Sequence, residues 1–439
     1  MAKRHGAARV SRRLGIFVAG GALLVPVPAA AQQGEPRVVT LEETIRLARG
    51  YDPPAVAAEA AVSTAQADVL QARGAFLPGI TANGIYGNSS NQRFDQATGQ
   101  LVSESYSAQL QGSLELFSGG RRLASLRAAG AGLEAADAEA RATDFETVLM
   151  ATETYYAAVA ARALRDVAER RVERARQQHA FAQQRYEVGT VTTSDVLRAE
   201  IELANAELAA IEAETDVRAT ELELGRVVGA AGAVRPSATQ LPERAPARPP
   251  LDVLVDRAVR SAPAVVAAEA EAASSRATRF VAYTPYLPSI RLAGGYDWFA
   301  FEFPPNQQSW SLRVIASLPV FNGFQREAAV QRARAFERVA EARARDATLA
   351  ARVSVETAMQ DIDLAERRVE VSSRTVGLAR EDLRVQEERY QIGAATILDL
   401  QASQVALAEA EAGEIRARQE LVGSVARLES ILGETIGED

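Results

Sequence analysis

The amino-acid sequence predicts a mainly α-helical chain with a smaller β-strand portion, in which one unit of helices and strands occurs twice. Three observations lead to this fold class: an internal duplication, two proline-free stretches at 121–188 and 325–392, and four segments of alternating apolar and polar residues. A long stretch without proline suits one uninterrupted helix, because proline removes a backbone donor and clashes with the preceding turn. Alternation at every second residue is typical of a strand with one apolar face.

The composition of the 439 residues is that of a folded protein, with 47% hydrophobic and 24% charged residues. The absence of cysteine excludes disulfides, thiolate metal sites and a lipid-modified N-terminal cysteine. His5 and His179 are the only histidines, which excludes most histidine-based metal sites and catalytic triads. We therefore expect no cofactor and no enzymatic activity. The net charge of -8 argues against a nucleic-acid partner.

The N-terminus has the pattern of an export signal. Basic residues at 3–13 precede an apolar run at 14–27, and small residues end at Ala31 before Gln32. We expect a signal peptide at 1–31 that is cleaved between these two residues. An uncleaved membrane anchor is the alternative, but the run is short for a span of roughly 20 residues. No later stretch reaches roughly 18 consecutive apolar residues, so a mature chain that enters a membrane would have to use strands.

The two halves of the chain carry the same landmarks in the same order. The matched segments are 53–60 with 263–270, 76–80 with 286–290, 115–120 with 319–324, and 185–196 with 389–400. Chance similarity between alanine-rich helices does not readily produce matched Pro, Gly, aromatic and Asp positions, so we infer a duplication. A Pro- and Ala-rich stretch at 236–250 indicates a linker. The expected domains are the signal peptide at 1–31, repeat 1 at 32–230, a linker at 231–250, repeat 2 at 251–433 and a tail at 434–439.

Each repeat is expected to contain a first helix, a strand pair, a long helix and a final helix. In repeat 1 these elements are predicted at about 41–73, 80–117, 121–188 and 194–229. In repeat 2 the strand pair, long helix and final helix are predicted at about 289–321, 325–392 and 398–432. The first helices should end before Pro78 and Pro288, since the residue before a proline disfavours the helical conformation.

The long helices should begin just after the strand pairs. Ser118 and Asn322 are expected as their N-caps, because short polar side chains there accept a backbone hydrogen bond. Gly119 and Gly323 follow them at the junction between strand and helix.

The strand pairs have features of membrane strands. Each strand is expected to have about 10–13 residues, enough to cross a bilayer at a tilt. The polar segments 88–104 and 302–309 would be loop tips, and Trp298 and Trp310 flank the second, as in an interfacial aromatic girdle. A half-buried soluble sheet is the alternative. Four strands cannot close a barrel, so in a membrane three copies would pool twelve strands around a lumen.

The second long helix shows an interrupted heptad pattern. Its apolar seam positions are Val355, Met359, Ile362, Val369, Val376 and Leu383. Polar residues between them and the many small alanines favour helices that contact neighbours on two sides, as in the wall of a cylinder. A soluble coiled-coil rod is the alternative. Because the first and final helices together match the long helix in length, we expect them to stack end to end beside it.

The duplication, the FLP and FSGG/FNGF junctions and the twin RYxxG turns together resemble the TolC family of outer-membrane efflux proteins, over about residues 38–433. The resemblance implies a homotrimer with a twelve-stranded β-barrel in the outer membrane, four strands from each copy, continued by an α-helical barrel through the periplasm. It implies the exit duct of a tripartite efflux or type I secretion system in a Gram-negative-type bacterium. The implied partners are outer-membrane lipid, a periplasmic adaptor (membrane fusion) protein and an RND-type or ABC-type inner-membrane pump.

The twin turns between long and final helices have capping signals of their own. Gly189 and Gly393 are expected as left-handed residues that end the long helices. Thr192 and Thr396 then begin the next helices, with acidic residues three positions later in the spacing of a capping box. Helix capping is therefore one sufficient explanation of these acidic residues.

The resemblance also implies a gate at these turns, at the periplasmic tip of the tunnel. The residues that match the family's tip pattern are Asp195, Asp399, Tyr186 and Tyr390. On a threefold axis Asp399 would form a ring of negative charges that favours cations and an open gate. Some family members have an arginine at the position of Ala395 and a second acid at that of Ala402, so this tip is expected to have one ring and fewer closing links.

An exported periplasmic coiled-coil adaptor or scaffold without a membrane barrel is the competing interpretation. It would explain the signal peptide and the helices, but not the duplicated strand pairs. The sequence leaves open whether the cargo is a drug, a metal or a protein.

Overall fold

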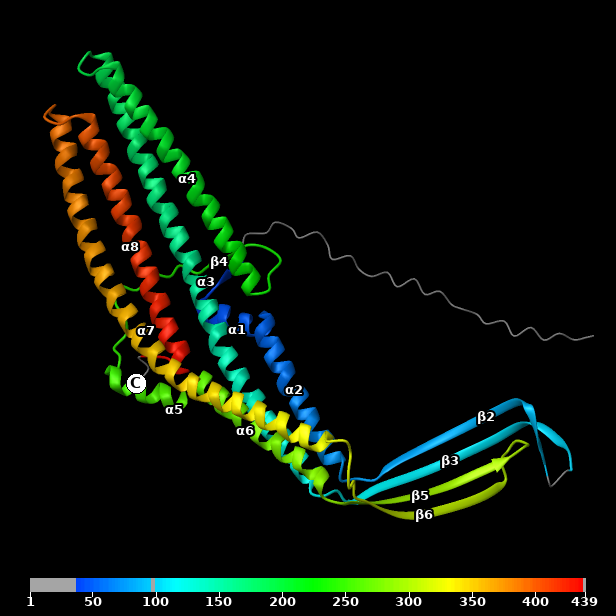
Figure 1. Cartoon of the computed structure of the whole chain (residues 1–439). Coiled ribbons are helices and arrows are strands. Elements are labelled where there is room, and N and C mark those ends of the chain that lie inside the picture. The colour runs from blue at the N-terminus through cyan, green and yellow to red at the C-terminus, as the bar shows by residue number, and fades with distance from the viewer. Residues whose placement is uncertain (1–36, 96–98, 437–439) are drawn as a thin grey trace, which may run out of the picture. The chain divides into compact units, whose positions relative to one another are not determined.

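The computed structural model describes residues 37–95 and 99–436, so the predicted signal peptide with Ala31 and Gln32 lies outside the described residues. Repeat 1 contains β1 (Arg37–Val39), α1 (Leu41–Tyr51), α2 (Pro53–Gly74), β2 (Gly79–Phe94), β3 (Leu101–Phe117), α3 (Arg121–Glu187) and α4 (Thr193–Val227). β4 (Val234–Pro236) follows. Repeat 2 contains α5 (Leu251–Ser261), α6 (Pro263–Tyr283), the 3₁₀ turn η1 (Thr284–Tyr286), β5 (Ser289–Ala300), β6 (Gln307–Ser317), α7 (Gln325–Gln391) and α8 (Ile397–Leu432). The two repeats thus share one order of elements (Figure 1).

The first helix of each repeat is two helices, so the prediction of a single helix at 41–73 was wrong. Asp52, between α1 and α2, has an extended conformation with ψ 121°. Pro53 and Pro263 occupy the first positions of α2 and α6. Proline fits the first turn of a helix but forces the residue before it out of the helical region. The same residues therefore end one helix and begin the next.

The predicted N-caps of the long helices were also wrong. The N-caps are Gly120 and Phe324, both in the left-handed conformation with φ of 79° and 62°. Ser118 lies two residues before the N-cap Gly120, and its hydroxyl still accepts a hydrogen bond from the Arg122 amide at 3.3 Å. Asn322 makes no such bond within the described residues, and its Oδ1 atom is buried without a partner there. The left-handed turn shifts each helix start beyond the polar residue.

The four long strands form one antiparallel sheet in the order β2-β3-β5-β6. β2 and β3 pair as far as Phe94 and Leu101, so the expected loop tip at 88–104 is shorter than predicted. Residues 88–93 are polar without alternation, which hid this extension. In the described chain β2 and β6 each pair along one edge only. Their outer edges are therefore open to another strand.

A second, two-stranded sheet joins the start of repeat 1 to the segment after it. β1 pairs in parallel with β4, with Val38 opposite Arg235. Val39 and Val234 are both buried, in a cluster with Tyr155 and Leu224. β4 lies within the expected linker at 231–250, whose sequence gives no strand signal because the strand has three residues.

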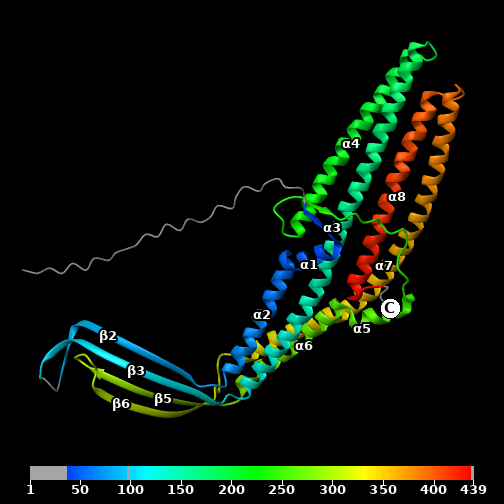
Figure 2. The ribbon, with the colours of Figure 1, turned by 180° about the vertical axis from the view of Figure 1, so that it is seen from behind.

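Each long helix packs along its length against two shorter helices of its own repeat. α3 packs on α2 and α4, and α7 packs on α6 and α8, so the shorter helices stack end to end beside the longer one (Figure 2). α3 also packs on α6 and α8, which joins the two repeats. The heptad residues of α7 are buried in these contacts except Met359, which is partly buried. No helix in the described residues is both long and apolar enough for a membrane span.

Candidate gate at the twin helix turns

The two turns that end the long helices have the same backbone geometry. Gly189 and Gly393 have φ of 73° and 78°. After each glycine the next amide donates back across the turn, from Thr190 to the Arg185 carbonyl at 2.9 Å and from Ala394 to the Arg389 carbonyl at 2.7 Å. This is the usual way in which a left-handed residue satisfies the last carbonyls of a helix.

A capping box begins the helix after each turn. The Asp195 and Asp399 carboxylates accept bonds from the amides of Thr192 and Thr396, both at 2.9 Å. The threonine hydroxyls accept in return from the aspartate amides, both at 3.3 Å. The amide bonds lower the pKa of both carboxyl groups, because they stabilise the charged form. Both turns therefore keep a negative charge close to a helix N-terminus, where the helix dipole favours it.

The two turns contact each other through Arg185 and Tyr390. The Arg185 Nη1 atom donates to the main-chain carbonyl of Tyr390 at 2.9 Å. The guanidinium also lies over two rings, 5.6 Å from the centre of Phe181 and 5.4 Å from that of Tyr390. Such an arrangement combines a hydrogen bond to a helix end with cation–π attraction.

Matched tip residues differ in their surroundings. Tyr390 is 5% exposed, in a cluster that includes Leu383 and Leu400, and this burial raises its pKa. Tyr186 is 48% exposed. Asp399 is exposed, whereas Asp195 is partly buried. The structure thus buries Tyr390 and leaves Asp399 and Tyr186 at the surface of the chain.

The strand–helix junctions show a similar contrast. Gly119 has φ of 60°, and a side chain there would meet the Leu287 Cβ atom at 2.7 Å and the Thr284 carbonyl at 2.9 Å. Gly323 has φ of 66° and no such neighbour within the described residues. Pro78 and Pro288 directly precede β2 and β5.

Sequence reasoning missed Arg185. The RY pair occurs in both turns, but its arginine has no local partner in the sequence that would indicate a role. Its contact is 205 positions away in the chain. Only the packing of α3 against repeat 2 brings the two groups together.

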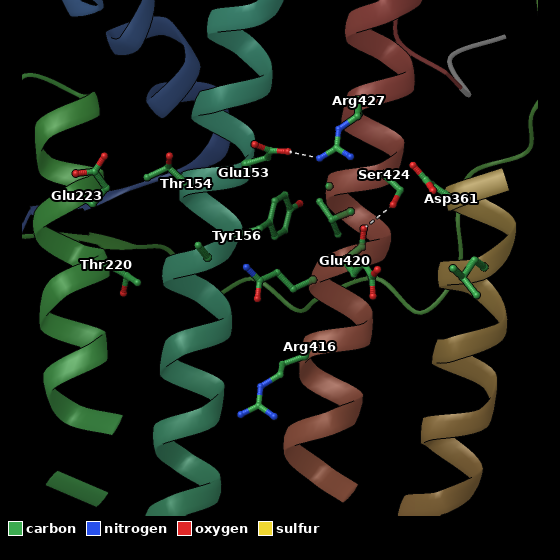
Figure 3. Close-up of a pocket in the computed structure, with 15 residues that line it drawn as sticks. Glu153, Thr154, Tyr156, Thr220, Glu223, Asp361, Arg416, Glu420, Ser424 and Arg427 are labelled. Carbon is green, nitrogen blue, oxygen red and sulfur yellow. Dashed lines mark hydrogen bonds and ion pairs between the residues drawn. The ribbon is translucent and has the colours of Figure 1, made fainter. Parts of the chain in front are cut away.

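A hollow of about 750 Å³ lies between α3 and α8 and is also lined by residues of α4 and α7 (Figure 3). Glu153 and Arg427 form an ion pair of 3.2 Å across it, and Arg416, Glu420 and Tyr156 also line it. Charges of both signs are mixed on this wall. The described residues contain no group of acidic or histidine side chains that could hold a metal ion.

Comparisons with known proteins agree with this architecture. The family model for outer membrane efflux proteins matches residues 44–230 and 254–434, one repeat each. The chain is 28% identical over 369 residues to protein CyaE of Bordetella pertussis, which covers 82% of this chain and 77% of that protein. It is 25% identical over 414 residues to the pyoverdine export outer membrane protein OpmQ of Pseudomonas putida, which covers 90% of this chain and 86% of that protein.

The fold is also that of a solved outer membrane protein. VceC from Vibrio cholerae superimposes with a TM-score of 0.73 at 19% identity, over 90% of this chain and 96% of VceC. The matched proteins are outer membrane transport proteins and not enzymes. The family match over both repeats, together with the four-stranded sheet, excludes the adaptor and scaffold alternatives. The chain belongs to the outer membrane efflux protein family and is a duplicated, mainly helical protein of the outer membrane.

Proposed function

We propose that this chain is the outer-membrane exit duct of a tripartite efflux or type I secretion system. The observation that carries the proposal is the sheet β2-β3-β5-β6, which is open at both outer edges in the described chain. Its apolar side chains are exposed, including Trp310, Leu312 and Val314 of β6. In lipid every backbone polar group needs a partner, so an open sheet has to be closed by further copies. Three copies give a twelve-stranded barrel.

The helices continue this barrel as a periplasmic tunnel. α3, α4, α7 and α8 lie side by side (Figures 1 and 2). The shorter helices α2 and α6 continue α4 and α8 beside the long helices, so that the wall keeps an even thickness. In this proposal a periplasmic adaptor docks at the tip, an RND-type or ABC-type pump delivers the substrate from the inner membrane, and lipid surrounds the strands. Family membership supports each of these partners.

The gate of the proposed tunnel is the pair of twin turns, with Asp399 as the ring residue. Asp399 is exposed and has its hydrogen bonds within its own turn, so its charge is free to face two further copies across a threefold axis. Asp195 has the same capping role but is partly buried within its own chain. Tyr390 supports the closed turn from within the chain, and Tyr186 is available to a neighbouring copy.

Single-channel conductance in a planar bilayer tests the ring. Asp399→Ala removes both the cap and the ring charge, whereas the matched control Asp195→Ala removes the same kind of cap without the ring charge. We expect cation selectivity in the wild type, its loss in Asp399→Ala and its retention in Asp195→Ala.

A channel that is indifferent to both changes would reduce Asp399 to a helix cap and keep the duct. Absence of any channel, with the wild-type protein recovered from the soluble periplasm, would overturn the exit-duct proposal.

A further inference from the structure

The contacts between the two repeats are made once in the chain, although the residues for making them occur twice. Arg185 of repeat 1 contacts Tyr390 of repeat 2. The matched residues are Arg389 and Tyr186. Within the described residues, the Arg389 side chain donates a hydrogen bond only to the Ala394 carbonyl of its own turn, at 3.3 Å. In the chain as described, one arginine therefore joins the two turns and its duplicate does not.

An ion pair further along the helices follows the same rule. Arg170 of α3 pairs with Glu411 of α8 at 3.3 Å. Counted in the register that matches Arg185 with Arg389, the corresponding residues are Arg374 and Glu207. Arg374 pairs instead with Glu370 of its own helix, and its side chain is 65% exposed. An arginine and a glutamate thus occupy the matched positions, but they belong to helices that do not meet extensively in the described chain.

The reason lies in the order of the helices. α3 of repeat 1 packs on α8 of repeat 2, whereas α7 of repeat 2 has no extensive contact with α4 in the described chain. Exposed apolar residues lie along α4, including Leu197, Ile201 and Leu208. Because α7 and α4 match α3 and α8 element for element, α7 of one copy placed on α4 of another would repeat the packing inside the chain.

We propose that Arg185 and Arg389 are paired latches at the tip. Arg185 holds the Tyr390 carbonyl of its own chain, and Arg389 holds the Tyr186 carbonyl of a second copy of this chain. The turns are then joined around the tip by alternating contacts within and between chains. That the latches close a tunnel rests on the proposed function, but the contact between copies does not.

The two latches differ in strength. Arg185 lies over Phe181, four residues earlier on its own helix, and the matched residue on α7 is Val385. Arg389 therefore lacks one of the two aromatic rings. An aromatic ring under a guanidinium favours the contact through cation–π attraction, so the contact within the chain is the stronger one.

Conductance of three variants tests the latches. We expect Arg185→Ala to raise the single-channel conductance or open probability several-fold, and Arg389→Ala to raise it by a smaller factor. Arg384→Ala is the control, since Arg384 is near the same turn but, in the part of the chain that the structure describes, pairs only with Glu381 and Glu388 of its own helix. It should conduct like the wild type. An unchanged Arg185→Ala channel would overturn the latch within the chain, and an unchanged Arg389→Ala channel the latch between chains.

Cross-linking tests the contact between copies independently of transport. The chain has no cysteine, so a short bismaleimide can join only introduced thiols. Arg374→Cys with Glu207→Cys should give covalent dimers and trimers on a denaturing gel. The matched control, Arg170→Cys with Glu411→Cys, should join within one chain and keep the mass of a monomer.

Monomers from both pairs, with thiols consumed, would show that the second contact does not form between copies. This result would overturn the proposal even if the protein conducts. A protein that cross-links as expected but forms no channel would instead contradict the proposed function and keep the contact.

Discussion

Gly119 and Gly323 occupy matched junctions between a strand and a long helix, and both have a positive φ, but their surroundings differ. Gly119 is packed against Leu287 and Thr284 of the other repeat, whereas Gly323 has open space in the described chain. Tyr390 and Tyr186 differ in the same way, because they also occupy matched positions but only Tyr390 is buried. The local sequence determines the turn, and the neighbouring repeat determines what the turn contacts. A duplicated chain therefore contains one set of inter-repeat contacts and the residues for a second.

Replacing the junction glycines should produce the largest difference between the repeats. Gly119→Ala combines a left-handed alanine, which costs about 1–2 kcal/mol, with overpacking against Leu287, which costs about 1–3 kcal/mol. We expect a total loss of about 3 kcal/mol. Gly323→Ala should lose only the about 1–2 kcal/mol that a left-handed alanine costs, unless a second copy packs on this residue. Thermal unfolding in detergent, followed by circular dichroism, measures both, and a larger loss for Gly323→Ala would contradict the comparison.

A buried polar pair distinguishes the repeats at the break between their first helices. Thr147 donates to the Asp52 carboxylate at 2.9 Å, and both residues are buried. The matched residues in repeat 2 are Ala351 and Ala262, which are buried in one apolar cluster. Thr147→Ala should therefore destabilise the fold by about 2 kcal/mol, because it leaves a buried acceptor without its partner.

Replacing both members of the pair should restore most of this stability. The double variant Asp52→Ala/Thr147→Ala copies the apolar pair of repeat 2, and loss of both partners can be nearly neutral. A double-mutant cycle on unfolding midpoints gives the coupling. If the double variant is less stable than Thr147→Ala alone, the carboxylate has a further role in the fold.

The pH dependence of the two turns should give the smallest effect. The lowered pKa of Asp195 and Asp399 means that the capping contribution is present above the ordinary aspartate pKa of about 3.9 and is lost as the pH falls through the lowered value. Hydrogen exchange at 189–199 and 393–403, corrected for the intrinsic rates, should therefore show protected turns down to about pH 4.

Assembly would sharpen this comparison. In a threefold ring, repulsion between like charges raises the pKa of Asp399 but leaves that of Asp195 unchanged. The repeat 2 turn should then lose protection at a higher pH than the repeat 1 turn. If both turns lose their protection from hydrogen exchange at the same pH, this would argue against a ring at Asp399.

Much of the fold follows from local signals in the sequence. Proline-free stretches predicted α3 and α7, because nothing else interrupts a helix so sharply. The glycines and threonines of the turns predicted the capping geometry, since each forms its contact within a few residues. The break at Pro53 follows from the same rule on proline, since proline suits the first turn of a new helix.

The remainder depends on partners distant in the sequence. β1 and β4 are three residues each and are strands only because they pair with each other. Arg185 acquires its role from the Tyr390 carbonyl in the other repeat. The ring at Asp399 depends on other copies, so its role is a proposal.

The parallel pair β1–β4 has a consequence for the order in which the chain is completed. Ribosomes and export machinery deliver a chain from its N-terminus, and β1 has to wait for β4, almost a whole repeat later. Contacts between such distant residues form slowly, because a large loop must close first. Once β4 arrives, the start and end of repeat 1 are clasped together. The order of synthesis then favours the closing of repeat 1 before repeat 2 is complete, and β6 is the last strand in chain order to pair with a neighbour.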